Sequence, residues 1–361
     1  MRASASERSA RSARSLRPSR RALLTGGGAG LAALGVSALG TGQAAAAAPA
    51  QAGGTPPGEG PWLPVPEVTE IARLGEHGCE GLVFDAEGRM FMSNTQGSEI
   101  FEIAQDGTWR EWTSGELVSP NGHRVLPDGT HVVVQMGPPA AVVWLDPDGT
   151  VLHTLTEDHQ GRPLRCLNDL AIDPRTGGVY FTDPGSFTER EPGRVFYVEG
   201  PGERPRVLVD EGVIDFPNGV ALSPDNDVLY ISEGRRNRVL RYPLTAPGQV
   251  GRGTVFTRLP SQPNTWSPIA EAQPDGLAVD SEGRLYIAHF GTGLVRVRDR
   301  YGRDLGSLDS RTPCLTNFAF GGPDLGQLFI TAHLGYDLDD PGAAVVVRMT
   351  LPGIQGLPLL S

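Results

Sequence analysis

The sequence predicts an all-β fold, a six-bladed β-propeller with four antiparallel strands in each blade. The first observation is a phrase that occurs six times: a polar residue, a small or apolar residue, an apolar run, a hairpin-type turn and a second apolar run. The leading residues lie 41 to 57 positions apart, a spacing typical of propeller blades. They are Glu80, Asn121, Asn168, Asn218, Asp275 and Asn317. The second observation is that no stretch after about residue 70 keeps helical apolar spacing over three turns.

The first fifty residues differ from the rest of the chain. Seven arginines precede a Gly/Ala/Leu-rich stretch and an alanine run, the order of a basic head, an apolar middle and a small-residue cleavage region. The segment around Arg20 and Arg21 resembles a twin-arginine signal. We expect residues 1–50 to be an export signal that the twin-arginine machinery reads, and the mature protein to be secreted or periplasmic. The alternative is a basic tail that carries no targeting signal. The middle stretch is interrupted by glycine, which argues against a stable membrane span.

The remaining chain predicts one domain. Residues 51–69 form a Pro/Gly-rich lead-in, and residues 70–361 hold the six phrases without a linker between them. The apolar run after each leading residue predicts a strand near the ring centre, and the next run returns through a hairpin. Shorter apolar segments between the phrases supply the third and fourth strands. The insert at 261–271, which contains Trp266, predicts a loop on the rim of one blade. A solenoid, the alternative repeat architecture, needs polar capping repeats that the last phrase does not provide.

Composition excludes several classes of function. The net charge is −11, and it becomes −17 without residues 1–50, which carry seven arginines and one glutamate. An acidic protein has no bulk attraction for nucleic acid or for an anionic membrane, and it concentrates divalent cations. The chain contains no lysine, which excludes Schiff-base chemistry and a P-loop lysine.

Three cysteines precede leading residues and form no zinc or CxxC pattern. They are Cys79, Cys166 and Cys314. Because the first and last blades of a closed ring are neighbours, a Cys79–Cys314 disulfide is conceivable. Buried free thiols are the favoured interpretation, since small apolar residues suit these positions.

Four leading residues carry the chemistry of a calcium site. Glu80, Asn168, Asn218 and Asp275 offer only oxygen donors, which calcium prefers, whereas zinc normally recruits His or Cys. A propeller brings equivalent positions of its blades together around one axis. We therefore expect one Ca²⁺, or another divalent cation, in the central tunnel. The alternative is that Asn-Gly and Asp-Gly are turn residues. That alternative does not explain Glu80, because glutamate is a poor turn former.

Several of these phrases resemble the regucalcin/gluconolactonase (senescence marker protein) family. The similarity covers about residues 70–350 and includes FPNGVALSPDNDVLYISE, PDGLAVDSEGRLYIAHFGTG and TNFAFGGPDLGQLFIT. Members are six-bladed propellers with a calcium ion in the central tunnel, and many hydrolyse lactones. By position, Glu80, Asn218 and Asp275 match the metal residues of the family, and Asp275 also matches its proposed catalytic carboxylate. Asn168 matches an asparagine that touches substrate in some members and metal in others.

The resemblance implies a calcium-dependent hydrolase that opens a lactone or related ester, a small-molecule substrate whose carbonyl the calcium polarises. Asp275 then acts as general base or as nucleophile. His123, two residues after Asn121, is the first candidate for proton transfer, and His289 is the second. Asn121, Asn168, Arg165 and His289 are candidate substrate-binding residues. Arg165 stands three residues before Asn168, whereas regucalcin-type members carry an arginine two residues before.

The residue that ends each second strand is polar in every blade and is expected beside the leading residues, either lining the pocket or orienting ligands. These residues are Asn94, Gln135, Asp183, Glu233, His289 and His333. Three alternative functions stay open. They are a paraoxonase-like phosphotriester hydrolase, a non-catalytic ligand-binding propeller in which calcium is only structural, and a strictosidine-synthase-like propeller. Propellers of the last group lack the four metal-binding residues.

Overall fold

The computed structural model describes residues 63–113, 115–186, 189–263, 271–335 and 342–358. The predicted export signal, most of the lead-in and Trp266 lie outside these residues. Within the described ranges, no helix is both long and apolar enough to cross a membrane.

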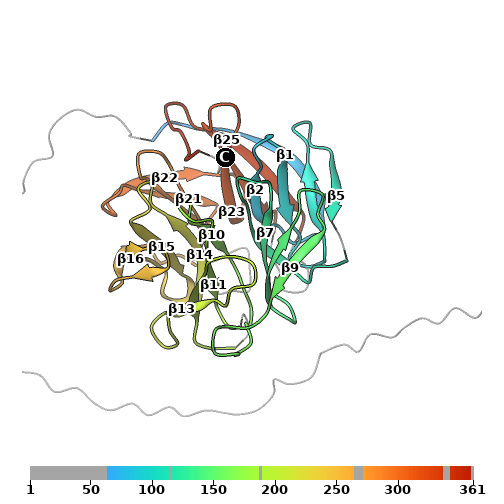
Figure 1. Cartoon of the computed structure of the whole chain (residues 1–361). Coiled ribbons are helices and arrows are strands. Elements are labelled where there is room, and N and C mark those ends of the chain that lie inside the picture. The colour runs from blue at the N-terminus through green and yellow to red at the C-terminus, as the bar shows by residue number, and fades with distance from the viewer. Residues whose placement is uncertain (1–62, 114, 187–188, 264–270, 336–341, 359–361) are drawn as a thin grey trace, which may run out of the picture. The chain divides into compact units, whose positions relative to one another are not determined.

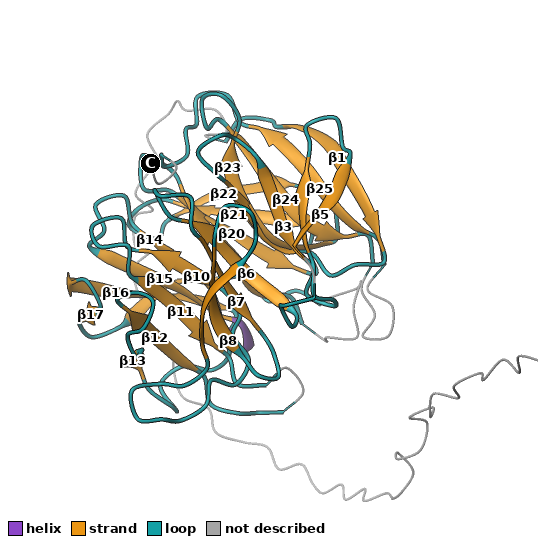
Figure 2. Ribbon diagram, turned by 45° about the vertical axis from the view of Figure 1, so that its right-hand side comes forward, coloured by secondary structure: helices purple, strands orange, loops and turns teal. Residues whose placement is uncertain are grey.

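Six antiparallel sheets confirm the predicted six-bladed propeller (Figures 1 and 2). Blade 1 holds β2 (Glu80–Phe84), β3 (Met90–Ser93), β4 (Ile100–Ile103) and β5 (Trp109–Thr113). Blade 2 holds β6 (Pro120–Val125), β7 (His131–Gln135), β8 (Ala141–Leu145) and β9 (Val151–Leu155). Blade 3 holds β10 (Leu170–Ile172), β11 (Val179–Asp183), β12 (Arg194–Val198) and β13 (Arg206–Val209).

The later blades follow the same order, with one addition. Blade 4 holds β14 (Pro217–Leu222), β15 (Val228–Glu233), β16 (Arg238–Ala246) and β18 (Thr254–Arg258), and the short β17 (Gln249–Val250) also pairs with β16. A 3-10 turn, η1 (Gly234–Arg236), links β15 to β16. Blade 5 holds β19 (Gln273–Val279), β20 (Leu285–Phe290), β21 (Leu294–Arg298) and β22 (Asp304–Asp309). The four-stranded blades match the sequence prediction, and β17 makes blade 4 the exception.

Blade 6 is assembled from both ends of the described chain. Its strands are β23 (Cys314–Gly321), β24 (Gln327–His333), β25 (Ala344–Thr350) and β1 (Glu67–Gly75). The first strand of the chain pairs antiparallel with the last, from Glu67 opposite Thr350 to Gly75 opposite Ala344. In Figure 1 the blue β1 accordingly lies against the red β25. This closing strand begins inside the segment that the sequence assigns to the lead-in.

Each contact between neighbouring blades has its own apolar core. The described residues form six buried hydrophobic clusters, and each cluster joins one adjacent pair of blades. The cluster between blades 6 and 1, for example, packs Ala72 and Phe329 against Leu82 and Met92. Burial at every interface, the closing one included, holds the inner strands at a fixed radius around the axis.

An Asp-x-x-Gly-Arg sequence fixes four of the turns. In the first, the Asp85 carboxylate accepts the Arg89 backbone N–H at 2.8 Å and the Arg89 Nε at 2.6 Å. Gly88 supplies the positive φ of 78° that the turn requires. The same pattern recurs at Asp158–Arg162, Asp280–Arg284 and Asp299–Arg303. Three of these turns set the register of the strand pairs that they connect, and the turn at Asp158 lies in the loop between β9 and β10.

Candidate active site

Glycine after the leading residue lets neighbouring inner strands approach closely. A Cβ on Gly81 would lie 2.0 Å from the Asn121 backbone oxygen, and Gly81 also has a positive φ of 55°. A Cβ on Gly276 would lie 2.8 Å from the Asn317 Cα. The ladder register shifts at both points, so the inner strands of blades 1 and 5 each carry a bulge beside the leading residue. The bulges place the leading residues of successive blades side by side.

Hydroxyl groups of neighbouring blades hold the backbone at or beside the leading residues. Thr182 donates to the Asn218 carbonyl and Ser232 to the Asp275 carbonyl, each at 2.7 Å. Thr316 donates to the carbonyl of Cys79, the residue before Glu80, also at 2.7 Å. Every one of these bonds crosses from one blade to the next. The inner ring is therefore fixed by hydrogen bonds as well as by close packing.

A cavity of about 220 Å³ opens at one end of the ring axis. Five of the six leading residues line it, namely Glu80, Asn121, Asn168, Asn218 and Asp275. The rest of its wall combines polar and apolar side chains, namely Cys79, Thr95, Gln96, Met136, Gln273, Phe290, Thr316 and His333. The structure thus brings together the four residues that the sequence predicts as metal ligands. Asn317, the sixth leading residue, is absent from this wall.

Three carboxylates are buried around this cavity, and sequence reasoning found only two of them. Asp169 directly follows Asn168, in a position that four other blades give to glycine, and it is 1% exposed. Burial raises the pKa of Glu80, and the nearby charge of Asp169 raises it further. Burial also raises the pKa of Asp275 well above its usual range, with added repulsion from Glu80 and Asp169. The three groups therefore form one interacting set of like charges.

Asp169 is held by groups from three other blades. Its carboxylate accepts the backbone N–H of Leu170 at 2.9 Å and of Val220, in blade 4, at 3.2 Å. The Asn317 amide of blade 6 donates hydrogen bonds to Asp169 and also to Glu80, and both bonds lower the pKa of their acceptors. Nη2 of Arg124, in blade 2, lies 3.7 Å from Asp169 Oδ1. Burial nevertheless raises the pKa of Asp169, with Arg124 opposing the shift.

The polar residues that end the second strands anchor the backbone that leads into the ring. Asn94 accepts the Gly78 N–H at 2.8 Å, two residues before Glu80. Three further blades repeat the arrangement: a side chain at the end of the second strand accepts a backbone N–H two or three residues before the leading residue. The side-chain acceptors and their backbone donors are Gln135 and Val118, Asp183 and Cys166, and Glu233 and Asp215. These side chains position the leading residues from outside the cavity. His333 is the one member of the predicted set that lines the cavity among the described residues.

Three predicted site residues do not line this cavity. His123 is fully buried, its Nε2 lies 2.8 Å from His131 Nδ1, and the pair packs against Phe91 and Trp112. The bulge between Pro120 and His123 adds a residue to the strand, which breaks the alternation that the prediction relied on. Burial and the His131 charge hold the pKa of His123 well below its usual range. His123 therefore has no proton-transfer geometry here.

His289 and Arg165 also have structural partners. His289 is buried, and its Nδ1 accepts a hydrogen bond from Arg296 Nε at 3.1 Å. Burial and the Arg296 charge lower the pKa of His289 to about 3. Arg165 donates to the Pro192 carbonyl at 2.7 Å and lies near the carboxylates of Asp183 and Glu211. Neither side chain is placed to contact a substrate in the cavity.

The donor set of the cavity fits a hard divalent cation. Oδ1 of Asn121 and Oδ1 of Asn218 are buried and have no hydrogen-bond partner among the described residues. Both lie in a cavity wall that also holds the carboxylates of Glu80 and Asp275. A cation held by oxygen ligands would give these amide oxygens a partner and would offset the repulsion between the carboxylates. Within the described ranges, no group of three or more His, Cys, Asp or Glu side chains could hold a metal ion. The predicted site is not such a group, because two of its four ligands are asparagines.

The three cysteines are free, as the favoured interpretation held. Cys79 and Cys314 are buried, and Cys166 is half-buried. Burial raises the pKa of the Cys79 thiol well above its ordinary value, and the neighbouring Glu80 charge adds to the shift. The Cys79 thiol is therefore uncharged and unreactive although it contributes to the cavity wall.

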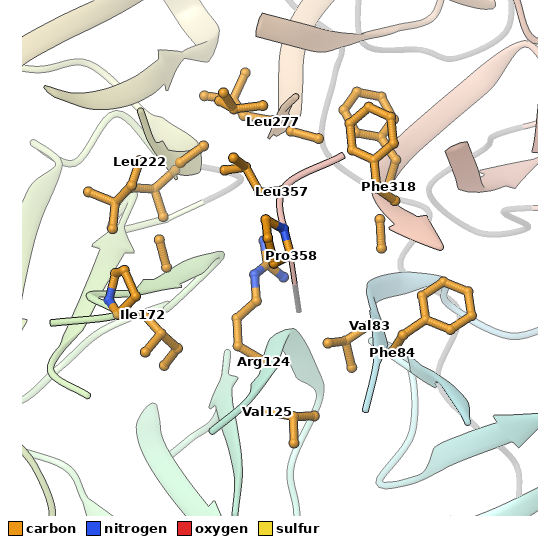
Figure 3. A pocket seen from close by; sticks show the side chains of 18 of the residues that line it. Val83, Phe84, Arg124, Val125, Ile172, Leu222, Leu277, Phe318, Leu357 and Pro358 are labelled. Carbon is orange, nitrogen blue, oxygen red and sulfur yellow. The ribbon is translucent and has the colours of Figure 1, made fainter. Parts of the chain in front are cut away.

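A second cavity, of about 480 Å³, lies among the apolar residues that follow the leading residues on the inner strands. Val83, Val125, Ile172, Leu222, Leu277 and Phe318 contribute to its wall (Figure 3). Leu357 and Pro358, near the C-terminus, stand in the same cavity as Arg124. Arg124 is the only charged residue among the described residues that line it.

The family model described as SMP-30/Gluconolactonase/LRE-like region matches residues 78–334. Lactonase drp35 of Staphylococcus saprophyticus is 27% identical over 252 residues, which are 69% of this chain and 72% of that protein. Lactonase drp35 of Staphylococcus aureus USA300 is 28% identical over 253 residues, with the same two coverages.

Two solved structures show the same fold at low identity. A gluconolactonase from Xanthomonas campestris matches with a TM-score of 0.65 at 23% identity, over 80% of this chain and 90% of that one. Regucalcin from Agrobacterium tumefaciens C58, described as a calcium-binding protein, matches with a TM-score of 0.64 at 23% identity, over 81% and 98%. These structures bear on the architecture alone.

Proposed function

Because the chain belongs to the SMP-30/gluconolactonase/LRE-like family, we propose that it is a calcium-dependent hydrolase that opens lactone rings in the central cavity. One observation carries the proposal. Two carboxylates and three asparagine amides, from five different blades, converge on a cavity of about 220 Å³. Relatives named lactonases support the reaction class, and the regucalcin structure described as calcium-binding supports the metal.

Glu80, Asn168, Asn218 and Asp275 would hold the ion. When bound, calcium supplies a Lewis acid that polarises the lactone carbonyl and stabilises the oxyanion that develops. The amides of Asn121 and Asn168 orient the substrate, while Met136 and Phe290 offer it apolar contact. This small cavity suits a small-molecule lactone or ester.

Asp275 performs the chemistry, either as general base on a water molecule or as direct nucleophile. Both roles need the carboxylate ionised, whereas burial and the charges of Glu80 and Asp169 raise its pKa. The Asp275 carboxylate would ionise more readily beside a bound divalent cation, so metal binding and the active protonation state would be coupled. His123 has no part in the proposal. We also propose, from the sequence of residues 1–50, that this segment is a twin-arginine export signal and that the mature protein is secreted or periplasmic.

The test is a substrate panel assayed with calcium and with a chelator. The purified protein is given sugar, aliphatic and aromatic lactones, together with paraoxon. We expect lactone hydrolysis that stops in the chelator and returns with calcium. Activity that survives complete removal of calcium contradicts the proposal, and activity on paraoxon alone makes the protein a phosphotriester hydrolase.

The Asp275→Asn variant separates the metal from the chemistry. The amide keeps one oxygen donor, so calcium binding is retained in part. Hydrolysis is expected to fall by a factor of about 100 or more, because neither base nor nucleophile remains. The kcat on the best lactone and calcium binding by calorimetry are measured on the same preparation. Unchanged turnover rules out both catalytic roles of Asp275.

A further inference from the structure

We propose that Arg124 is a built-in counter-ion of the central carboxylates, and that its fixed positive charge weakens the binding of a divalent cation at the leading residues. The inference rests on the proposed function, in that it assumes a cation site formed by Glu80, Asn168, Asn218 and Asp275. It concerns a residue outside that site, which lies beside Asp169.

The position of Arg124 is set by two contacts. It belongs to β6, its Nη1 donates to the backbone oxygen of its neighbour His123 at 2.7 Å, and its Nη2 lies 3.7 Å from Asp169 Oδ1. The side chain is 21% exposed and projects into the second cavity, near the middle of the view in Figure 3. A guanidinium cannot lose its proton in a protein, so this positive charge is permanent.

Arg124 is linked to the cation site through Asp169, which lies 3.7 Å from its Nη2. The Asp169 carboxylate shares the Asn317 amide with Glu80, one of the four predicted ligands. Asp169 itself does not line the cation cavity among the described residues. The three ionised carboxylates and one guanidinium carry a net charge of −2, which one divalent cation neutralises. Without Arg124 the same groups carry −3.

The surroundings of Arg124 keep its interactions strong. Apolar side chains of all six blades line the second cavity, and Leu357 and Pro358 stand in it. The C-terminal segment is fastened by two backbone hydrogen bonds, Ser281 N–H to Gln355 at 2.9 Å and Gly356 N–H to Leu325 at 2.8 Å. With 21% of its side chain exposed, Arg124 is less screened by water and salt than a surface arginine.

Loss of this charge has two effects of opposite sign. The metal-free protein becomes less stable, because Asp169 and Glu80 then repel one another without a cation nearby. Calcium binding becomes tighter, because one positive charge no longer repels the ion. A purely structural role for Arg124 predicts lower stability without tighter binding, so the two properties together distinguish the roles.

The experiment measures calcium binding to metal-free full-length protein by titration calorimetry, and thermal unfolding in a chelator. The Arg124→Met variant is expected to bind calcium at least about fivefold more tightly than the wild type and to unfold at a lower temperature. Arg124→Lys keeps the charge and should bind as the wild type does. Arg303→Met, on a surface hairpin with its side chain 75% exposed, makes the same change in net charge and should leave affinity unchanged.

A second pair of variants covers the case in which Arg124→Met does not fold. Asp169→Asn leaves the guanidinium without its partner and should weaken calcium binding at least about fivefold. The double variant Arg124→Met/Asp169→Asn restores the net charge of −2 and should bind about as tightly as the wild type. If Asp169 were a direct ligand, the double variant would bind far more weakly.

The outcomes separate the two proposals. A wild-type protein that binds no calcium contradicts the proposed function. Calcium binding by the wild type, with equal or weaker binding by Arg124→Met, overturns the counter-ion role. In the second pair, unchanged binding by Asp169→Asn or a large loss in the double variant overturns it as well.

Discussion

At position 80 the chain carries a glutamate where four of the other five leading residues are asparagine. Its carboxylate is buried beside Asp169 and accepts hydrogen bonds from the Gly81 N–H at 3.2 Å and from the Asn317 amide. These two bonds offset only part of the burial and repulsion, since the pKa of Glu80 stays raised. The ionised Glu80 carboxylate therefore destabilises the metal-free fold, and a bound cation would stabilise it.

Glu80→Gln is predicted to separate these two effects. The variant removes one of three repelling charges and keeps the side-chain shape, so the metal-free protein at pH 7.5 should unfold at a higher temperature than the wild type. Calcium affinity should fall by a factor of about 10 or more, since a charged donor is lost. Calorimetry and thermal unfolding in chelator test the pair of outcomes. A variant that is less stable in chelator and binds calcium normally would show that Glu80 is structural.

The inner strands depend on glycine at their bulges. Gly276→Ala brings a Cβ to 2.8 Å from the Asn317 Cα, and backbone must move to relieve the overlap. The free energy of unfolding is predicted to fall by about 2 kcal/mol. Gly200→Ala is the matched control, because no atom lies within 4 Å of the added Cβ. Urea unfolding of both variants decides the matter, and equal stability would mean that the blades are not packed as described.

The closing strand β1 is predicted to stabilise the whole ring. Ala72 is 3% exposed in the core between blades 6 and 1, whereas the neighbouring Arg73 side chain is 54% exposed. Ala72→Asp places an unpaired carboxylate in that core and should lower the free energy of unfolding by more than about 3 kcal/mol. Arg73→Asp, on the opposite side of the strand, should change it by less than about 1 kcal/mol. Similar losses in both variants would argue against closure by β1.

Sequence reasoning predicted the elements that repeat and missed those that occur once. Spacing and turn chemistry gave six blades, and five of the six leading residues line one cavity because inner strands share an axis. Asp169 was missed because its position is glycine in four other blades, although a charged residue there was itself a signal. The closing strand was missed because it lies outside the repeated phrase. His123 was misplaced because a bulge changes which way the following residues face.

For the whole molecule, the buried carboxylates predict how stability depends on pH. Glu80, Asp169 and Asp275 have raised pKa values in the folded protein, whereas in the unfolded chain they titrate near pH 4. Groups of this kind stabilise the fold at low pH, and that contribution is lost as the pH rises through the raised pKa. In a chelator, the unfolding temperature should therefore fall as the pH rises from 6.5 to 8, below the range in which the thiols of Cys79, Cys166 and Cys314 begin to titrate in the unfolded chain.

Saturating calcium should abolish this fall, because the bound ion keeps the carboxylates ionised in the folded state. The comparison is made above pH 6.5, because below that pH the buried histidines change the unfolding temperature in the opposite direction. His123 and His131 have lowered pKa values, and their contribution is lost as the pH falls below 6.5. Thermal unfolding at several pH values, with and without calcium, makes the comparison. The same slope in both conditions would mean that no cation binds near these groups.

The most direct test of the account is a crystal structure of the protein grown with calcium. The account predicts a single ion in the smaller cavity, within coordinating distance of side-chain oxygens from Glu80, Asn168, Asn218 and Asp275. An ion bound elsewhere, or these four side chains hydrogen-bonded only to one another at saturating calcium, would contradict it.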